Sequence, residues 1–232
     1  MALRLRELHP EREFEFVITP TGDESDEMLE HWRRLMVILG PLVPLTCGLS
    51  LQGLIEKHRM LPNWRARWCT RQLKIEPYEA FLIRSAPAVS YVGLRADEEV
   101  RGGMEFRGDI PEVELTFPMR DWGWRMGDVL SYLDERGIVI PPRTDCMSCF
   151  FQTLGEWYEL WRTDRPLYLD YEQNESTISR ERDRQCTYRS DGRDSWPAPL
   201  SALRAEFEAG RRPRGVDQPD LFGQARCRVC SM

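Results

Sequence analysis

The fold of this chain is decided by one stretch, FEFVITPTGDE at residues 14–24. Its first five residues are mostly aromatic or β-branched, which favours a short strand. The small and acidic residues after them predict a turn. Beyond the turn, Ser25 or Asp26 serves as an N-cap, and apolar residues recur at helical spacing as far as Gly40. A second short strand at 42–45 completes a strand–helix–strand unit, which predicts parallel pairing.

The same alternation continues along the chain. Further strands are predicted at 89–94 and 113–117, and further helices at 1–8, 49–58, 73–83, 126–136, 150–161 and 200–209. We therefore predict an α/β domain over residues 1–165, with a doubly wound, mostly parallel sheet covered by helices on both faces. Residues 166–232 are predicted to form a polar C-terminal extension, with little regular structure between 170 and 199.

The composition is that of an ordinary globular protein. Of 232 residues, 41% are hydrophobic and 30% are charged, so a well-buried core is expected. The sequence has neither an apolar run long enough to span a membrane nor a signal peptide, and these absences predict a cytoplasmic protein. The net charge of −6 argues against nonspecific coating of nucleic acid.

Cysteines carry the strongest chemical signal. Cys69 lies among Arg65, Arg67, Arg71 and Lys74, cations that would favour its thiolate form. Two Cys-x-x-Cys pairs follow, whose spacing indicates metal or redox chemistry in a reducing compartment. The pairs are Cys146 with Cys149, and Cys227 with Cys230.

Four interpretations of these thiols stay open. A cubane iron–sulfur (4Fe–4S) cluster would use Cys69, Cys146 and Cys149, with Cys227 or Cys230 as the fourth ligand. Structural zinc would use the two Cys-x-x-Cys pairs, although these pairs lie far apart in the sequence. The terminal pair would otherwise be a mobile redox dithiol, or all the thiols would be inert packing residues. Cys47 and Cys186 have no partner at metal-ligand spacing.

The order of four segments resembles the phosphoadenosine phosphosulfate reductase-like branch of the PP-loop ATP pyrophosphatase superfamily. The segments are FVITPTGDE at 16–24, WCTRQLK at 68–74, GLRADEEVR at 93–101, and PMRDW at 118–122 with the helix that leads to Cys146 and Cys149. The resemblance covers residues 1–149. It implies a PP-loop-type sheet, an adenine nucleotide such as ATP with magnesium, and an iron–sulfur cluster.

The resemblance also implies site residues. Thr21, Gly22 and Asp23 would contact the nucleotide, and Arg95 and Arg101 would contact its phosphate or sulfate. Three departures limit the reaction: the family's Ser-Gly-Gly-x-Asp-Ser phosphate loop is absent, as is its Glu-Cys-Gly-x-His segment, and Cys227-x-x-Cys230 stands at the end instead. The resemblance implies that the missing first strand and phosphate loop would lie upstream of Met1.

These observations predict an enzyme of sulfur transfer, sulfonucleotide reduction or adenylylation. Its expected partners are an adenine nucleotide, a sulfur donor or thiol reductant protein, and a nucleic acid substrate. The alternative is a catalytically silent, zinc-stabilised binding module that acts with a partner protein or nucleic acid.

Overall fold

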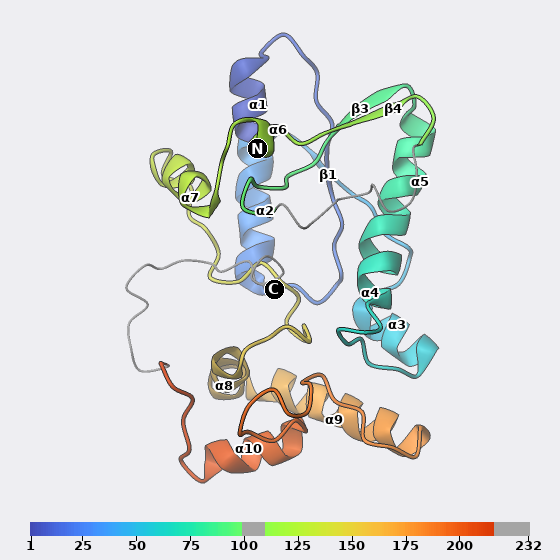
Figure 1. Ribbon diagram of the computed structural model, residues 1–232, viewed down its shortest axis with the longest axis vertical. Helices are drawn as coiled ribbons and strands as arrows, with labels where there is room; N and C mark the ends of the chain where they lie inside the picture. Colours follow the sequence, from blue (N-terminus) through green and yellow to red (C-terminus); the bar gives the residue numbers. More distant parts are fainter. Residues whose placement is uncertain (99–109, 216–232) are drawn as a thin grey trace. The chain divides into compact units, whose positions relative to one another are not determined.

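The computed structural model describes residues 1–98 and 110–215 (Figure 1). Contacts within the chain divide these residues into two units, each discontinuous in sequence. Of these described residues, the first unit comprises 1–48 and 70–144, and the second comprises 49–69 and 145–215. The predicted domain boundary at residue 165 therefore lies inside the second unit. None of the described helices is both long enough and apolar enough to cross a bilayer.

The first unit contains four short strands in two parallel pairs. The strands are β1 (Phe16–Ile18), β2 (Leu42–Pro44), β3 (Ala88–Tyr91) and β4 (Val113–Thr116). β1 pairs with β2, with Val17 opposite Val43, and β3 pairs with β4, with Ser90 opposite Leu115. The predicted mixed α/β class with parallel strands is thus confirmed. The described strands form two separate sheets rather than a single one.

Helices flank these strands in the first unit. They are α1 (Ala2–Leu8), α2 (Asp26–Leu39), η1 (Arg71–Ile75), α5 (Glu76–Ser85), α6 (Pro118–Asp121) and α7 (Met126–Asp134). The predicted N-cap of α2 is confirmed, because the Ser25 hydroxyl accepts a hydrogen bond from the backbone N–H of Met28 at 3.2 Å. The guanidinium of Arg6 on α1 donates to the carbonyls of Ile38 and Leu39, so α1 is attached to the last turn of α2.

The helix predicted at 73–83 begins earlier and contains a π-helical turn. It starts with α4 (Trp68–Thr70), continues through η1 and ends with α5. Within η1 the Glu76 N–H bonds to the Arg71 carbonyl, and the Arg71 guanidinium reaches the Glu76 carboxylate at 2.7 Å. A π-turn brings residues i and i+5 together, so this ion pair fits the local winding.

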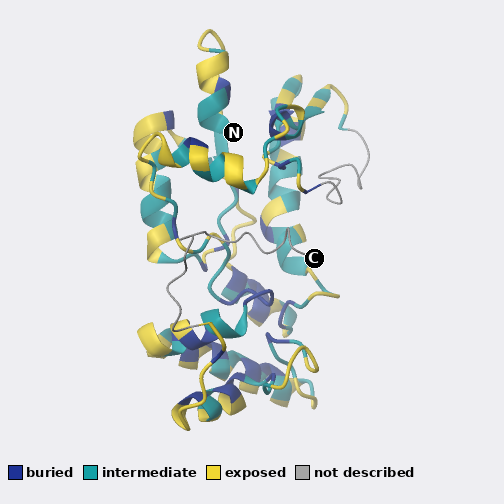
Figure 2. Cartoon of the chain, turned by 60° about the vertical axis from the view of Figure 1, so that its left-hand side comes forward, coloured by how far each residue is buried: buried dark blue, intermediate teal, exposed yellow. Residues whose placement is uncertain are grey.

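The second unit is helical. Its helices are α3 (Leu51–His58), α8 (Leu154–Thr163), α9 (Arg165–Glu181) and α10 (Leu200–Glu208). Buried residues recur along these helices (Figure 2). The core is aromatic: Trp157, fully buried, contacts the rings of Tyr168, Tyr171 and Tyr188, with ring centroids 6.0–6.3 Å apart.

The prediction of little regular structure between 170 and 199 is wrong for residues 170–181, which belong to α9. Asp164 caps this helix by accepting from the Leu167 N–H at 3.2 Å. Its buried positions recur at helical spacing, but one of them is a glutamate, Glu175, and the face therefore looks polar in the sequence.

Candidate functional site

The loop after β1 holds the predicted nucleotide-edge residues. The Glu24 carboxylate accepts from the Thr21 N–H and hydroxyl, both at 2.6 Å, and from the Gly22 N–H at 2.9 Å. Thr21 and Asp23 are buried, and Gly22 has a φ of +72°, which glycine adopts without strain. Glu24 thus occupies donors that a phosphate would need, so an anionic ligand here would compete with it.

The loop after β3 holds Arg95 in a similarly closed arrangement. Its guanidinium is buried and forms ion pairs with Asp97 at 2.8 Å and with Glu98 at 3.5 Å. Burial alone would raise the pKa of Asp97, but the hydrogen bond and charge of Arg95 outweigh it and lower that pKa. The Glu98 carboxylate also accepts from the Arg95 backbone N–H at 2.9 Å. Arg101, predicted beside Arg95, lies outside the described residues.

The first Cys-x-x-Cys pair lies on a tight turn. The Cys149 N–H donates to the Cys146 carbonyl at 3.1 Å, and the Gln152 N–H donates to the Cys149 carbonyl at 2.9 Å. A β-turn keeps its first and fourth Cα atoms within about 7 Å, close enough for two thiolates to bind one metal centre. Cys149 is buried and Cys146 is half-buried. The turn therefore suits half of a thiolate site.

The segment that carries Cys69 contacts the segment that follows this turn. The Arg67 guanidinium lies 5.4 Å from the centre of the Phe151 ring. On the other side, the Trp68 ring lies 5.1 Å from the His58 ring, which anchors the segment to α3. Cys69, which is half-buried, is two residues from Arg67, and Cys149, which is buried, is two residues from Phe151. Two of the three cysteine segments that we predicted to converge therefore lie side by side.

A complete metal site is not present within residues 1–98 and 110–215. No group of three or more His, Cys, Asp or Glu side chains in that part of the chain is arranged to hold one ion. Cys227 and Cys230 lie outside the described residues; the cluster hypothesis requires one of them, and the zinc hypothesis requires both. The described thiols therefore fit a metal only as a partial ligand set, and the cofactor stays a prediction.

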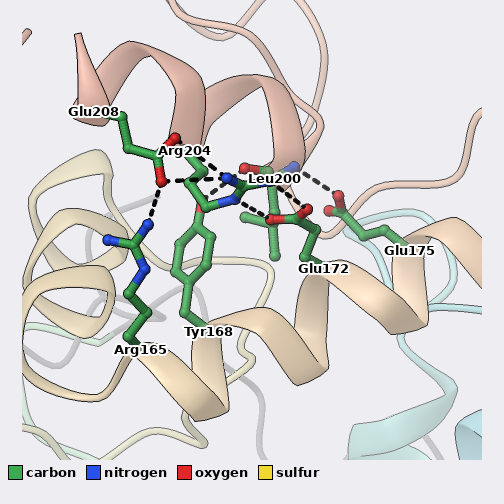
Figure 3. A network of polar contacts seen from close by, with 7 residues as sticks. All are labelled: Arg165, Tyr168, Glu172, Glu175, Leu200, Arg204 and Glu208. Atoms are coloured by element: carbon green, nitrogen blue, oxygen red, sulfur yellow. Dashed lines mark hydrogen bonds and ion pairs between the residues drawn. The ribbon is translucent and has the colours of Figure 1, made fainter.

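The structure adds a polar network that the sequence did not reveal (Figure 3). Glu175 on α9 is buried and accepts from the Tyr188 N–H at 2.8 Å and from the Leu200 N–H at 2.6 Å. The Tyr168 hydroxyl donates to the Leu200 carbonyl at 2.8 Å. Two α9 side chains thus bind both backbone groups of the first residue of α10, whose N–H would otherwise lack an acceptor.

Three ion pairs extend this network toward solvent. Arg204 donates to both oxygens of Glu172, at 2.9 and 3.1 Å, and also contacts Glu208, which in turn pairs with Arg165. A two-pronged arginine–carboxylate pair fixes orientation as well as distance. The network therefore holds α10 on α9. A signal for it did exist in the sequence: Glu172 and Glu175 share a helix with Tyr168 at i+4 and i+7.

Burial sets the protonation of the central carboxyl. It raises the pKa of Glu175 to about 8, although the two backbone N–H donors and a nearby arginine act in the opposite direction. A cavity of about 450 Å³ lies beside this group, lined by polar side chains that include Glu172, Ser176 and Thr187. Ser179 lines this cavity, and its hydroxyl accepts from the Cys186 N–H and donates to the Cys186 carbonyl. These two hydrogen bonds hold this part of the lining in place.

Comparison of the chain with protein-family models, with curated proteins and with solved structures finds no match.

Proposed function

We propose that this chain is an adenine-nucleotide-binding enzyme, similar to phosphoadenosine phosphosulfate reductases, that transfers a sulfur or adenylyl group and carries an iron–sulfur cluster. The cluster ligands would be Cys69, Cys146 and Cys149, with Cys227 or Cys230 as the fourth. The observation that carries the proposal is the contact of Arg67 with Phe151, because it brings the Cys69 segment beside the Cys146–Cys149 turn. Such a cluster needs thiolate ligands and accepts ligands from distant parts of a sequence.

The nucleotide part of the proposal depends on the first unit. Its parallel strand pairs would belong to a doubly wound sheet of the PP-loop type, and ligands of such sheets bind at the carboxyl ends of the strands. Thr21, Gly22 and Asp23 follow β1, and Arg95 follows β3, which supports their proposed role as nucleotide contacts. Arg95 would exchange its contact with Asp97 for a phosphate or sulfate oxygen.

One observation favours a second candidate, the catalytically silent binding module stabilised by zinc. In both loops the polar groups expected to contact nucleotide are already satisfied from within: Glu24 caps one loop, and Asp97 and Glu98 pair with Arg95 in the other. A loop whose polar groups are paired with one another in this way keeps its conformation without a ligand. Zinc bound to Cys146, Cys149, Cys227 and Cys230 would then only hold the chain together.

Metal analysis of anaerobically purified full-length protein separates the two candidates. The enzyme predicts iron and acid-labile sulfide with a broad visible absorption band, and Cys149→Ser should remove most of all three. Cys47→Ser is the matched control, because Cys47 is exposed and has no ligand spacing. Stoichiometric zinc without iron would establish the binding module instead. Protein free of both metals and unaffected by Cys149→Ser would refute both metal sites.

Nucleotide binding is tested separately by calorimetry with ATP, adenylyl sulfate and phosphoadenylyl sulfate. Arg95→Met should weaken binding by tenfold or more, since it removes the proposed anion contact. Arg34→Met is the control, because Arg34 pairs with Glu30 on the exposed face of α2. Equal affinities in the two variants would exclude Arg95 from the site. Unchanged far-ultraviolet circular dichroism would show that Arg95→Met still folds.

A further inference from the structure

The cavity of about 450 Å³ in the second unit has a polar lining that carries acidic groups and no basic ones. Its walls come from α9, from the segment after α9 and from the start of α10. Among the described residues the lining consists of two glutamates, two glutamines, three serines, a threonine, a cysteine, a leucine and a proline. Its volume falls within the range of small-molecule sites, roughly 300–1,000 Å³.

The carboxyl of Glu175 lies between two segments of this lining. Glu175 is only 4% exposed, and its oxygens accept from the Tyr188 N–H and the Leu200 N–H. The residues next to these two donors, Thr187 and Ser201, also line the cavity. The buried carboxyl is therefore part of the wall of the cavity and is held there by backbone on both sides.

This buried carboxyl has no ion pair within the described part of the chain, whereas the acidic groups around it do. Arg204 donates to both oxygens of Glu172 (Figure 3), and Arg189 forms an ion pair with Asp194 at 2.8 Å. Removal of a carboxylate from water is costly unless a cation accompanies it. An ionisable group beside an open space and without a counter-ion in contact indicates that the space takes a positively charged molecule.

We propose that this cavity binds an aliphatic diamine or polyamine, with one ammonium group beside Glu175 and a second beside Glu172. The two carboxylates are three residues apart on α9, where neighbouring side chains are about 5–6 Å apart at Cβ, which suits two ammonium groups on one short carbon chain. The hydroxyl and amide oxygens of the lining would accept the remaining N–H groups. Leu169 and Pro199 would contact the methylene groups.

A metal ion suits this lining less well than an amine does. No group of three or more His, Cys, Asp or Glu side chains in residues 1–98 and 110–215 is arranged to hold one ion. Calcium and magnesium ions take six or more oxygen ligands at close range. An ammonium group needs only two or three acceptors, because it donates three hydrogen bonds in directions that rotate freely.

Binding of an amine should release a proton. Without a ligand, burial raises the pKa of Glu175 to about 8, while Tyr168 and Glu172 on α9, Arg189 after α9 and Arg204 on α10 are the titratable and charged groups around it. An adjacent ammonium favours the carboxylate. An aliphatic ammonium keeps its own proton at neutral pH, as lysine does. The affinity should therefore rise by up to about tenfold per pH unit between pH 6 and 8.

Calorimetry of the full chain with putrescine and spermidine tests this proposal. Both amines should bind, and 1,4-butanediol, which has the length of putrescine without its charges, should not. Titrations in buffers with different heats of ionisation measure the proton released. Glu175→Gln should weaken amine binding at least tenfold and abolish that release, because an amide carries neither the charge nor the titration.

A matched pair of variants locates the site without changing a buried residue. Ser176→Lys places a fixed ammonium group in the lining at an exposed position of α9, and it should weaken amine binding at least tenfold. Ser131→Lys makes the same change at an exposed position of α7 in the first unit, and it should bind as the parent does. Circular dichroism checks that all three variants fold.

Three results would overturn the proposal. One is the absence of amine binding to the parent chain at millimolar concentration. Another is equal affinity of Ser176→Lys and Ser131→Lys for putrescine, because the amine would then bind elsewhere. The third is binding of 1,4-butanediol as tight as that of putrescine, which would make the ligand a neutral polar molecule. The proposal is independent of the proposed enzyme, since it uses none of the cysteines or loop residues assigned to it. Cys149→Ser should therefore leave amine binding unchanged.

Discussion

The two units of this chain use their apolar residues in opposite ways. In the second unit, helices α8, α9 and α10 bury large aromatic side chains completely, and a network around Glu175 satisfies the backbone groups at the start of α10. In the first unit, β1 is half-buried and an apolar cavity separates two strand pairs. Burial of apolar area is the main favourable contribution to folding. The helical unit therefore buries its large apolar side chains more completely than the stranded unit does.

The largest expected effect on the difference between the two units comes from Trp157→Ala in the second unit. Trp157 is fully buried among three tyrosine rings, and removal of such a side chain should cost about 3–5 kcal/mol of unfolding free energy. Hydrogen exchange should show the loss in α8, α9 and α10 but not in α2 or α5. Leu169→Ala, at a 42% exposed position on α9, is the control and should cost little. A loss of equal size in both units would mean that they unfold as one.

The sequence predicted the first unit better than the second, for a local reason. Strands β1 to β4 and helix α2 have regular apolar patterns, and Ser25 marks where α2 begins. Helix α9 was missed because one of its buried positions is the glutamate Glu175, so its pattern becomes visible only when α10 and the Tyr188 segment supply the partners. A buried polar residue depends on hydrogen bonds to distant parts of the chain, and the spacing of apolar residues in the sequence does not reveal those contacts.

The candidate site residues also differ in how much of their arrangement the sequence could predict. Spacing alone predicted that Cys146 and Cys149 act together in metal or redox chemistry, and the structure places them on one turn. The contact between the Cys69 segment and Phe151 depends on the packing of distant segments and could only be hypothesised. The burial of Arg95 and Glu98 was not predicted for another reason: charged residues close together in a sequence usually lie at the surface.

A change at Glu175 should make the stability of the second unit less dependent on pH. Burial raises the pKa of Glu175 from 4.5 to about 8, so the folded state keeps a proton that the unfolded state loses. This contribution to stability is complete below about pH 4.5 and is lost as pH rises through 8. Glu175→Gln should flatten the fall in melting temperature across that window. It should also cost about 1–3 kcal/mol, because its amide nitrogen cannot accept a backbone N–H.

The control for this prediction is Glu159→Gln, since Glu159 is exposed on α8 and pairs only with its neighbour Arg162 among the described residues. Its melting temperature should follow that of the parent at every pH. If Glu175→Gln also ran parallel to the parent from pH 4.5 to 8, the buried carboxyl would not titrate in that window. The network in Figure 3 would then hold α10 through its ionised form alone.

The smallest expected effect comes from a matched pair of helix caps, one in each unit. The Ser25 hydroxyl accepts from the Met28 N–H in α2, and the Ser50 hydroxyl accepts from the Gly53 N–H in α3, both at 3.2 Å. Each serine-to-alanine change should cost about 1 kcal/mol. Hydrogen exchange should place the loss from Ser25→Ala in α2 and that from Ser50→Ala in α3, and the double variant should show the sum of both. The two changes remove equivalent hydrogen bonds. Any loss of amide protection that one change causes in the other unit would therefore measure the coupling between the units directly.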